Sequence, residues 1–220
     1  MINQLLSIDW TPLLISFKLS FVTTSVLLFF SIPFAWYLSQ SNSRFKPLLE
    51  AITALPIVLP PSVLGFYLLI LFSDLKDIFN VELLFNFWGL VIASIIYSLP
   101  FMVQPLQSGF EGLNKRVIEA SYIAGKSSWI TLWRVALPNI KPALITAIII
   151  TFAHTLGEFG VVLMVGGSIP NETKVASVAI YEMVEIMDYS TAHIYSGIMV
   201  ALSFITLIAV FIFNRYKKIV

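Results

Sequence analysis

The sequence predicts an all-α polytopic membrane protein with five transmembrane helices. Of its 220 residues, 58% are hydrophobic and 11% are charged, and the mean hydropathy is +0.91. A soluble domain of this size carries about a quarter charged residues, so most of this surface must face lipid. An open β-arrangement would leave backbone groups unpaired in lipid, and the apolar runs show no period-two alternation. The spans are therefore expected to be helices.

Five apolar segments each reach the ~20 residues that a helix needs to cross the hydrocarbon. No internal repeat or linker divides them, so residues 1–220 are expected to form a single transmembrane domain. The expected spans lie at about 13–38, 48–72, 87–106, 142–165 and 194–213.

The charges orient these spans. Most of the 13 basic residues fall on one side of an alternating topology, whereas the other side is mainly acidic. By the positive-inside rule, the N-terminus lies outside and the C-terminus is cytoplasmic. Residues 1–10 lack a basic stretch and a small-residue cleavage site, so no removable signal peptide is expected. The basic residues on the expected cytoplasmic side are Arg44, Lys46, Lys115, Arg116, Lys126, Arg134, Lys141, Arg215, Lys217 and Lys218.

Composition and spacing exclude several other classes of protein. The chain has no cysteine, which excludes disulfides, thiolate metal sites and cysteine nucleophiles. Its net charge of +1 gives no indication of nucleic-acid binding. No carboxylate–histidine cluster has metal spacing, and no Ser/His/Asp set suggests hydrolysis. We therefore expect no metal site and no catalytic residue.

The long loop at about 107–141 is predicted to form a cytoplasmic helix-turn-helix. Helix formers fill residues 113–124, and Gly125 suits the left-handed position that ends such a helix. Ser127 or Ser128 is a plausible N-cap for a second helix. The loop should therefore present a compact polar tip.

Within this loop, Ala120–Ser127 fits a relaxed phosphate-loop pattern, an Ala or Gly followed by four residues and Gly-Lys-Ser. A phosphate loop needs a strand before it and a helix after it, so that backbone amides cradle the phosphates. The preceding residues read as helix, and no parallel sheet is predicted. We interpret the match as coincidental.

The sequence Gly157-Glu158-Phe159-Gly160 lies toward the outer end of the fourth expected span. A charged side chain in a membrane costs roughly 3 kcal/mol on insertion scales, so it faces a partner or water. His154 stands one helical turn earlier and could pair with Glu158. The two interpretations are a buried contact that holds the bundle together and a group that lines or gates a pathway.

Prolines interrupt the second expected span at Pro56, Pro60 and Pro61, next to Ser62. They free backbone carbonyls and kink the helix, which lipid tolerates only where neighbours or a cavity satisfy those groups. The kink indicates either a pathway lining or a packing bend.

The spacing in the long loop resembles the EAA loop of ABC-importer permeases: Glu-Ala-Ala, three residues, Gly, nine residues, Ile-x-Leu-Pro. Ser121 replaces the second alanine and Val135 the isoleucine, both mild changes. In that family the short helix fits a cleft on the nucleotide-binding subunit and transmits its closure to the spans. The alternative is an amphipathic loop on the membrane surface. The residues that the resemblance assigns to ATPase coupling are Glu119, Ala120, Ser121, Gly125, Lys126, Leu137 and Pro138.

Further segments narrow the resemblance to molybdate-type permeases, the ModB family, over essentially the whole chain. They are the proline-rich residues 55–65, residues 156–160, the Ile-Pro-x-x-Thr stretch within 167–173, and residues 179–181. The pathway or gate candidates on these segments and beside them are Pro56, Pro60, Pro61, Ser62, His154, Gly157, Glu158, Phe159 and Gly160.

The resemblance implies the non-enzymatic permease subunit of a bacterial or archaeal importer that brings molybdate or tungstate across the inner membrane. It implies a homodimer, two cytoplasmic ATPase subunits that bind ATP and Mg, and an extracytoplasmic oxyanion-binding protein. This chain would hold no cofactor. A sulfate or thiosulfate permease is the closest alternative. An ion-coupled secondary transporter would need intramembrane charge pairs or an internal repeat, for which Glu158 alone is thin support.

Overall fold

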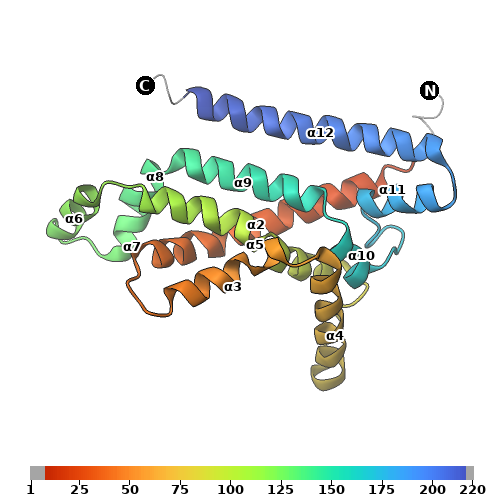
Figure 1. Cartoon of the computed structure of the whole chain (residues 1–220), viewed down its shortest axis with the longest axis horizontal. Coiled ribbons are helices and arrows are strands. Elements are labelled where there is room, and N and C mark those ends of the chain that lie inside the picture. The colour runs from red at the N-terminus through yellow and green to blue at the C-terminus, as the bar shows by residue number, and fades with distance from the viewer. Residues whose placement is uncertain (1–7, 217–220) are drawn as a thin grey trace.

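The computed structural model describes residues 8–216, which form helices and no strand (Figure 1). This confirms the all-α class. Three helices in this part of the chain are long and apolar enough to cross a membrane, or up to five if each of two bent pairs is one span. Of the basic residues used to orient the chain, Lys217 and Lys218 lie outside the described residues.

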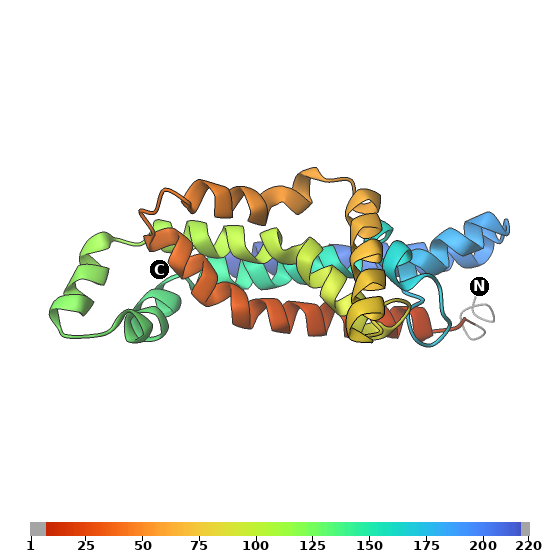
Figure 2. The same ribbon diagram turned by 90° about the horizontal axis from the view of Figure 1, so that it is seen from below.

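Three helices run side by side to form the centre of the molecule (Figures 1 and 2): α2 (Thr11–Gln40), α5 (Phe87–Glu111) and α9 (Lys141–Leu156). The largest buried cluster includes Trp36 of α2 and Phe110 of α5, whose rings meet edge to face at 5.2 Å. Small hydroxyl residues also lie on the buried face of α2. Such residues let membrane helices approach closely, because lipid gives apolar side chains no reason to associate.

The second expected span is two helices with a sharp turn between them. Helix α3 (Lys46–Val58) and helix α4 (Pro61–Phe79) meet at 111°. The prolines explain the turn: Leu59 is extended, as residues before proline are, and Pro60 and Pro61 have no N–H with which to continue the helix. Helix α4 therefore projects away from the bundle (Figure 1).

The fourth expected span, 142–165, is also interrupted. Helix α9 ends at Leu156, and the short helix α10 (Gly160–Gly166) follows after residues 157–159. The second bent pair lies at the N-terminal end of α9, where residues 128–139 meet α9 at 82°. Residues 142–165 are mainly apolar, so one continuous span was expected. The structure instead has a break at the two glycines of the Gly-Glu-Phe-Gly sequence.

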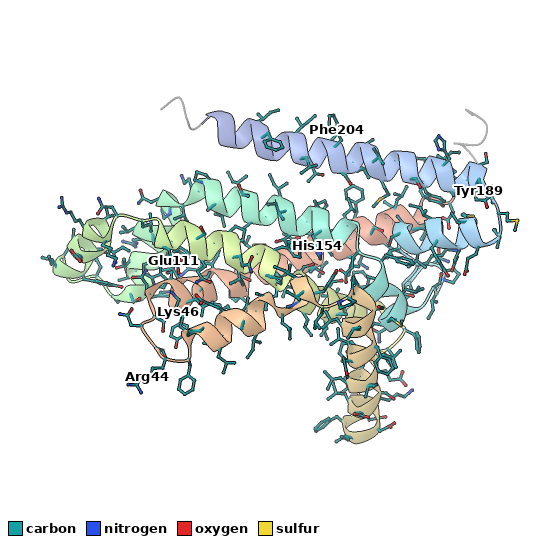
Figure 3. All side chains as sticks on the ribbon, in the orientation of Figure 1. Arg44, Lys46, Glu111, His154, Tyr189 and Phe204 are labelled. Atoms are coloured by element: carbon teal, nitrogen blue, oxygen red, sulfur yellow. The ribbon has the colours of Figure 1, made fainter. Side chains whose placement is uncertain are left out.

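Helix α12 (Tyr189–Tyr216) runs along the outside of the bundle beside α9 (Figure 1). Helix α11 (Ala176–Glu185) precedes it and packs against it at the end where α10 also lies. Only 11% of the most apolar window of α12 is buried, and Phe204 points away from the bundle (Figure 3). This apolar, unburied helix is suited to lipid.

Helices α5 and α9 pack tightly against each other at Gly109. A Cβ at this residue would lie 2.6 Å from the Cβ of Ala143. Gly197 on α12 is a matched helical glycine, because a Cβ there would meet nothing within 4 Å.

We therefore expect Gly109→Ala to destabilise the bundle by about 1–3 kcal/mol through overpacking. Gly197→Ala should leave stability unchanged or slightly raised, since alanine favours helix over glycine. Thermal unfolding of both variants in detergent measures the difference. Equal melting temperatures for the two variants would contradict the close approach of α5 and α9.

Candidate functional site

The long loop folds as the predicted helix-turn-helix. Helix α6 (Lys115–Ile123) begins at Asn114, whose side chain accepts a hydrogen bond from the Arg116 N–H at 3.0 Å. Gly125 has φ +73° and ends the helix in the left-handed region, as expected. Ser127, one of the two predicted caps, accepts from the Ile130 N–H at 3.4 Å and starts α7 (Ser128–Thr131).

Buried contacts fix the two arms of the loop to each other and to the bundle. The hydroxyls of Ser121 and Thr131 are 2.9 Å apart and join α6 to α7. The Trp36 indole N–H donates to the Ser128 hydroxyl at 3.1 Å and ties the loop to α2. Ser121, which the sequence suggested was a mild replacement for alanine, is thus the polar link between the arms.

After α7 the chain continues through a π-helical turn (Leu132–Ala136) and the short α8 (Leu137–Asn139). Leu132 and Ala136 are fully buried in the largest apolar cluster, together with Ile118 of α6. The loop therefore packs against the bundle as one stiff unit.

The outer surface of this loop combines apolar and charged groups. Ile123 is 87% exposed and Trp129 60% exposed, and the Trp129 and Trp133 rings lie 5.6 Å apart. Large exposed apolar groups among charges indicate a surface that binds a protein or a membrane. Of the residues assigned to coupling, those exposed here are Glu119, Ala120, Gly125, Lys126 and Pro138, whereas Ser121 is buried and Leu137 half-buried.

The apparent phosphate-loop sequence lies at the end of α6 and in the turn after it. A helix, not a strand, precedes the turn, and the described residues contain no strand at all. This segment lacks the strand–loop–helix arrangement that cradles phosphates. The structure therefore agrees with the interpretation that the match to a phosphate loop is coincidental.

At the opposite end of the bundle, the two helix breaks meet. A Cβ on Gly160 would lie 2.9 Å from the Cβ of Pro61 and 3.3 Å from the Ser62 nitrogen. A hollow of about 480 Å³ opens beside this contact. Its lining residues are Pro61, Ser62, Tyr97, His154, Gly157, Glu158, Phe159 and Gly160. The structure thus brings most of the pathway candidates together.

Two of the candidates stand apart from this hollow. Pro56 is buried within α3, and Pro60 forms the N-cap position of α4. Pro60 lies on the turn that positions Pro61 and Ser62, and Pro56 lies in the helix before it, but neither lines the hollow.

Glu158 is only 4% exposed, and neither carboxyl oxygen has a hydrogen-bond partner among the described residues. The Ser94 hydroxyl, also buried and without a partner, lies near it. The backbone carbonyl of Glu158 accepts from the Ser177 hydroxyl at 2.6 Å, which holds the break against α11. A buried carboxyl group without a partner is unfavourable in a membrane unless water, an ion or a movement of the surrounding helices satisfies it.

His154 does not pair with Glu158. Its Nδ1 lies 3.0 Å from the Ser98 hydroxyl, which in turn lies 2.9 Å from the Thr155 hydroxyl. The Thr155 hydroxyl donates to the Thr151 carbonyl at 3.0 Å. Each hydrogen bond in this series therefore has one donor and one acceptor when Ser98 donates to Thr155 and His154 Nδ1–H donates to Ser98. The ring also stacks on Phe101 at 3.9 Å. His154 therefore joins α9 to α5.

The loop at residues 166–174 is tied internally. The Thr173 hydroxyl donates to the Gly166 carbonyl at 2.6 Å and accepts from the Ile169 N–H at 3.0 Å. Lys174 forms an ion pair with Glu182 of α11. The threonine of the Ile-Pro-x-x-Thr sequence therefore closes this loop over the end of α10.

Sequence reasoning missed a group of four polar side chains that joins α3 to α5 beside the loop at residues 107–141. Its members are Lys46, Glu50, Gln107 and Glu111. Lys46 was used only to orient the chain, and the other three residues were not singled out. Lys46 and Glu111 are 65 positions apart in the sequence, so no local pattern indicated their contact.

Comparisons with known proteins agree with this geometry. The profile described as "Binding-protein-dependent transport system inner membrane component" matches residues 28–220. The molybdenum transport system permease protein ModB of Azotobacter vinelandii is 44% identical over 95% of this chain and 96% of its own length. The probable sulfate transport system permease protein cysT of Marchantia polymorpha is 31% identical over 98% of this chain and 79% of its own length.

Solved structures share the fold. A structure of the MetNI methionine ABC transporter, described as inward-facing, aligns with a TM-score of 0.74 over 93% of this chain and 94% of that chain, at 16% identity. Together with the profile match and the identity to ModB, this places the chain in the family of binding-protein-dependent transport system inner membrane components.

Proposed function

We propose that this chain is the permease subunit of an ABC importer that moves molybdate or tungstate into the cytoplasm. The observation that carries the proposal is 44% identity to a molybdenum permease over nearly the whole of both chains. A sulfate or thiosulfate permease is the second candidate, favoured by 31% identity to a sulfate permease. The lower identity makes it the weaker one.

The proposed topology has five spans, with the N-terminus outside and the C-terminus in the cytoplasm. It adds two broken spans, α3 with α4 and α9 with α10, to the long helices α2, α5 and α12. Its orientation rests on the positive-inside rule. Two copies would form a homodimer, since a chain without internal repeats supplies only one wall of a pathway. We also propose that residues 1–220 form a single transmembrane domain.

The proposed mechanism separates ATP chemistry from transport. Two ATPase subunits would bind ATP and Mg, and this chain would hold no cofactor, metal or catalytic residue. We call the loop at residues 107–141 the docking loop. Closure of the ATPase pair would draw the docking loops of the two copies together. Because the two arms of each loop are joined through Ser121 and the loop is fixed to its bundle through Trp36, the force would reach the spans and open the outer end. An extracytoplasmic binding protein would deliver the oxyanion there.

The hollow beside Glu158 supports a pathway role for the outer breaks. None of its lining residues is a lysine or an arginine. A strong anion site needs such donors or an array of backbone amides. Selection of the oxyanion would therefore rest mainly with the binding protein, and this hollow would pass the anion rather than hold it.

Reconstitution with the partner proteins tests the cargo. Purified chain, its ATPase and the binding protein in proteoliposomes should hydrolyse ATP faster when the binding protein carries molybdate or tungstate. Oxyanion uptake should follow ATP. A response to sulfate, with none to molybdate or tungstate, would replace the proposed cargo by the second candidate.

Gly125 tests the docking role of the loop. Gly125→Pro forces φ to about −65° where the chain needs +73°, and it removes the N–H that donates to the Tyr122 carbonyl at 2.9 Å. We expect ATPase co-purification to fall roughly tenfold or more, as on loss of an interface hot spot. Gly125→Asn is the matched control, since asparagine tolerates the left-handed region. Retention of the ATPase by the proline variant would argue against docking.

Glu158 tests the pathway role of the outer hollow. Glu158→Ala should leave ATPase docking intact but lower oxyanion uptake per ATP by about tenfold, a typical coupling between distant sites. Glu158→Gln, which keeps the shape, should retain more uptake than the alanine variant. Normal uptake by Glu158→Ala would show that this carboxyl group has no part in the pathway.

A further inference from the structure

Four polar side chains join α3 to α5 at the end of the bundle that carries the docking loop (Figure 3). Lys46 Nζ lies 3.0 Å from Glu111 Oε1 and 3.6 Å from Glu50 Oε1. Gln107 Nε2 donates to Glu50 Oε1 at 2.6 Å and to Glu111 Oε1 at 3.0 Å. Two of these contacts stay within a helix and two cross from one helix to the other, so the group is a closed polar clamp.

The clamp matters because α3 has little other attachment. Only Thr53 and Pro56 are buried along this helix, and Leu48, Ile52 and Val58 are exposed apolar residues suited to lipid. Leu49 is the single α3 residue that packs partly against the largest apolar cluster. The position of the inner end of α3 is therefore set mainly by polar contacts with α5.

Glu111 connects the clamp to the docking loop. It is the last residue of α5, and α6 begins four residues later at Lys115. The link between them is folded tightly: the Gly112 N–H donates to the Ser108 carbonyl at 3.0 Å, and the Leu113 N–H donates to the Phe110 carbonyl at 3.2 Å. A displacement of α6 would therefore move Glu111 with it.

The other end of α3 leads to the outer break. Helix α3 ends at Val58, and the extended Leu59 and Pro60 deliver Pro61 to its contact with Gly160. Helix α3 is thus a lever of 13 residues that is clamped near the docking loop and bent beside the hollow.

We propose that the Lys46–Glu111 clamp is the connection through which movement of the docking loop reaches α3 and, through it, the outer helix break. Lys46, Glu50, Gln107 and Glu111 are positioning residues, since none of them needs to touch cargo or ATP. The inference rests on the proposed transport function and adds the route by which force crosses this chain.

A second ion pair provides a control. Lys76 Nζ lies 3.0 Å from Glu82 Oε1, the same distance as between Lys46 and Glu111, but both side chains are more than half exposed. Lys76 lies in the last turn of α4, and Glu82 lies three residues after the end of this helix. Exposed ion pairs of this kind contribute little. If the clamp were only such a pair, reversing either set of charges would have the same small effect.

The experiment is a charge-reversal cycle in the reconstituted complex. Lys46→Glu and Glu111→Lys are each expected to lower oxyanion uptake per ATP hydrolysed by about tenfold, the usual size of a coupling energy, while the ATPase still co-purifies. The double variant Lys46→Glu/Glu111→Lys should restore most of the loss, because the pair is re-formed with its charges exchanged. Lys76→Glu, Glu82→Lys and their double variant should behave as wild type.

Each outcome decides the proposal. Uptake per ATP that stays normal in both single variants overturns it, and so does a double variant as poor as the singles. Loss of ATPase binding in the single variants would show that the clamp shapes the docking surface itself, which also overturns the proposed route. A wild-type complex that transports no oxyanion would instead contradict the proposed function, so the two failures are distinguishable.

Discussion

The half of this bundle that lies away from the loop at residues 107–141 depends on the close approach of Gly160 to Pro61. Two helices break there, one because consecutive prolines cannot continue it and one at a pair of glycines. Lipid offers no hydrogen bonds to a broken backbone, so such breaks must lie against protein or line a cavity. Each break covers the other, and the hollow beside Glu158 lies next to their contact.

The opposite end of the molecule is built for stiffness. Ser121, Thr131, Trp36 and Ser128 tie the docking loop to itself and to α2, and Leu132 and Ala136 bury it against the bundle. The apolar groups that stay exposed on its surface, Ile123 above all, are then held in fixed positions. A partner subunit would therefore move the loop as a rigid unit and not merely deform it.

The sequence was informative wherever a signal is local. Low charge and long apolar runs predicted an all-helical membrane protein, and Gly125 with Ser127 predicted the turn, because a left-handed cap and an N-cap depend on neighbouring residues only. A kink at the prolines of the second expected span was predicted, but the turn of 111° that divides this span into two helices was not, and neither were the break after Leu156 and the clamp of Lys46 with Glu111. Their geometry depends on contacts between residues far apart in the chain, which hydropathy and spacing do not record.

Buried polar groups carry most of the functional information in this chain. The exposed apolar faces of α4 and α12 carry little, because lipid tails are as apolar as leucine and such faces are stable without a partner. A carboxyl group without a partner and a histidine tied through two hydroxyls are each unfavourable in a membrane unless something satisfies them. The histidine is satisfied within the chain, and it joins two helices. Glu158 is not satisfied within the described residues, which is why its hollow, and not the larger apolar surface, is the place to look for contact with cargo.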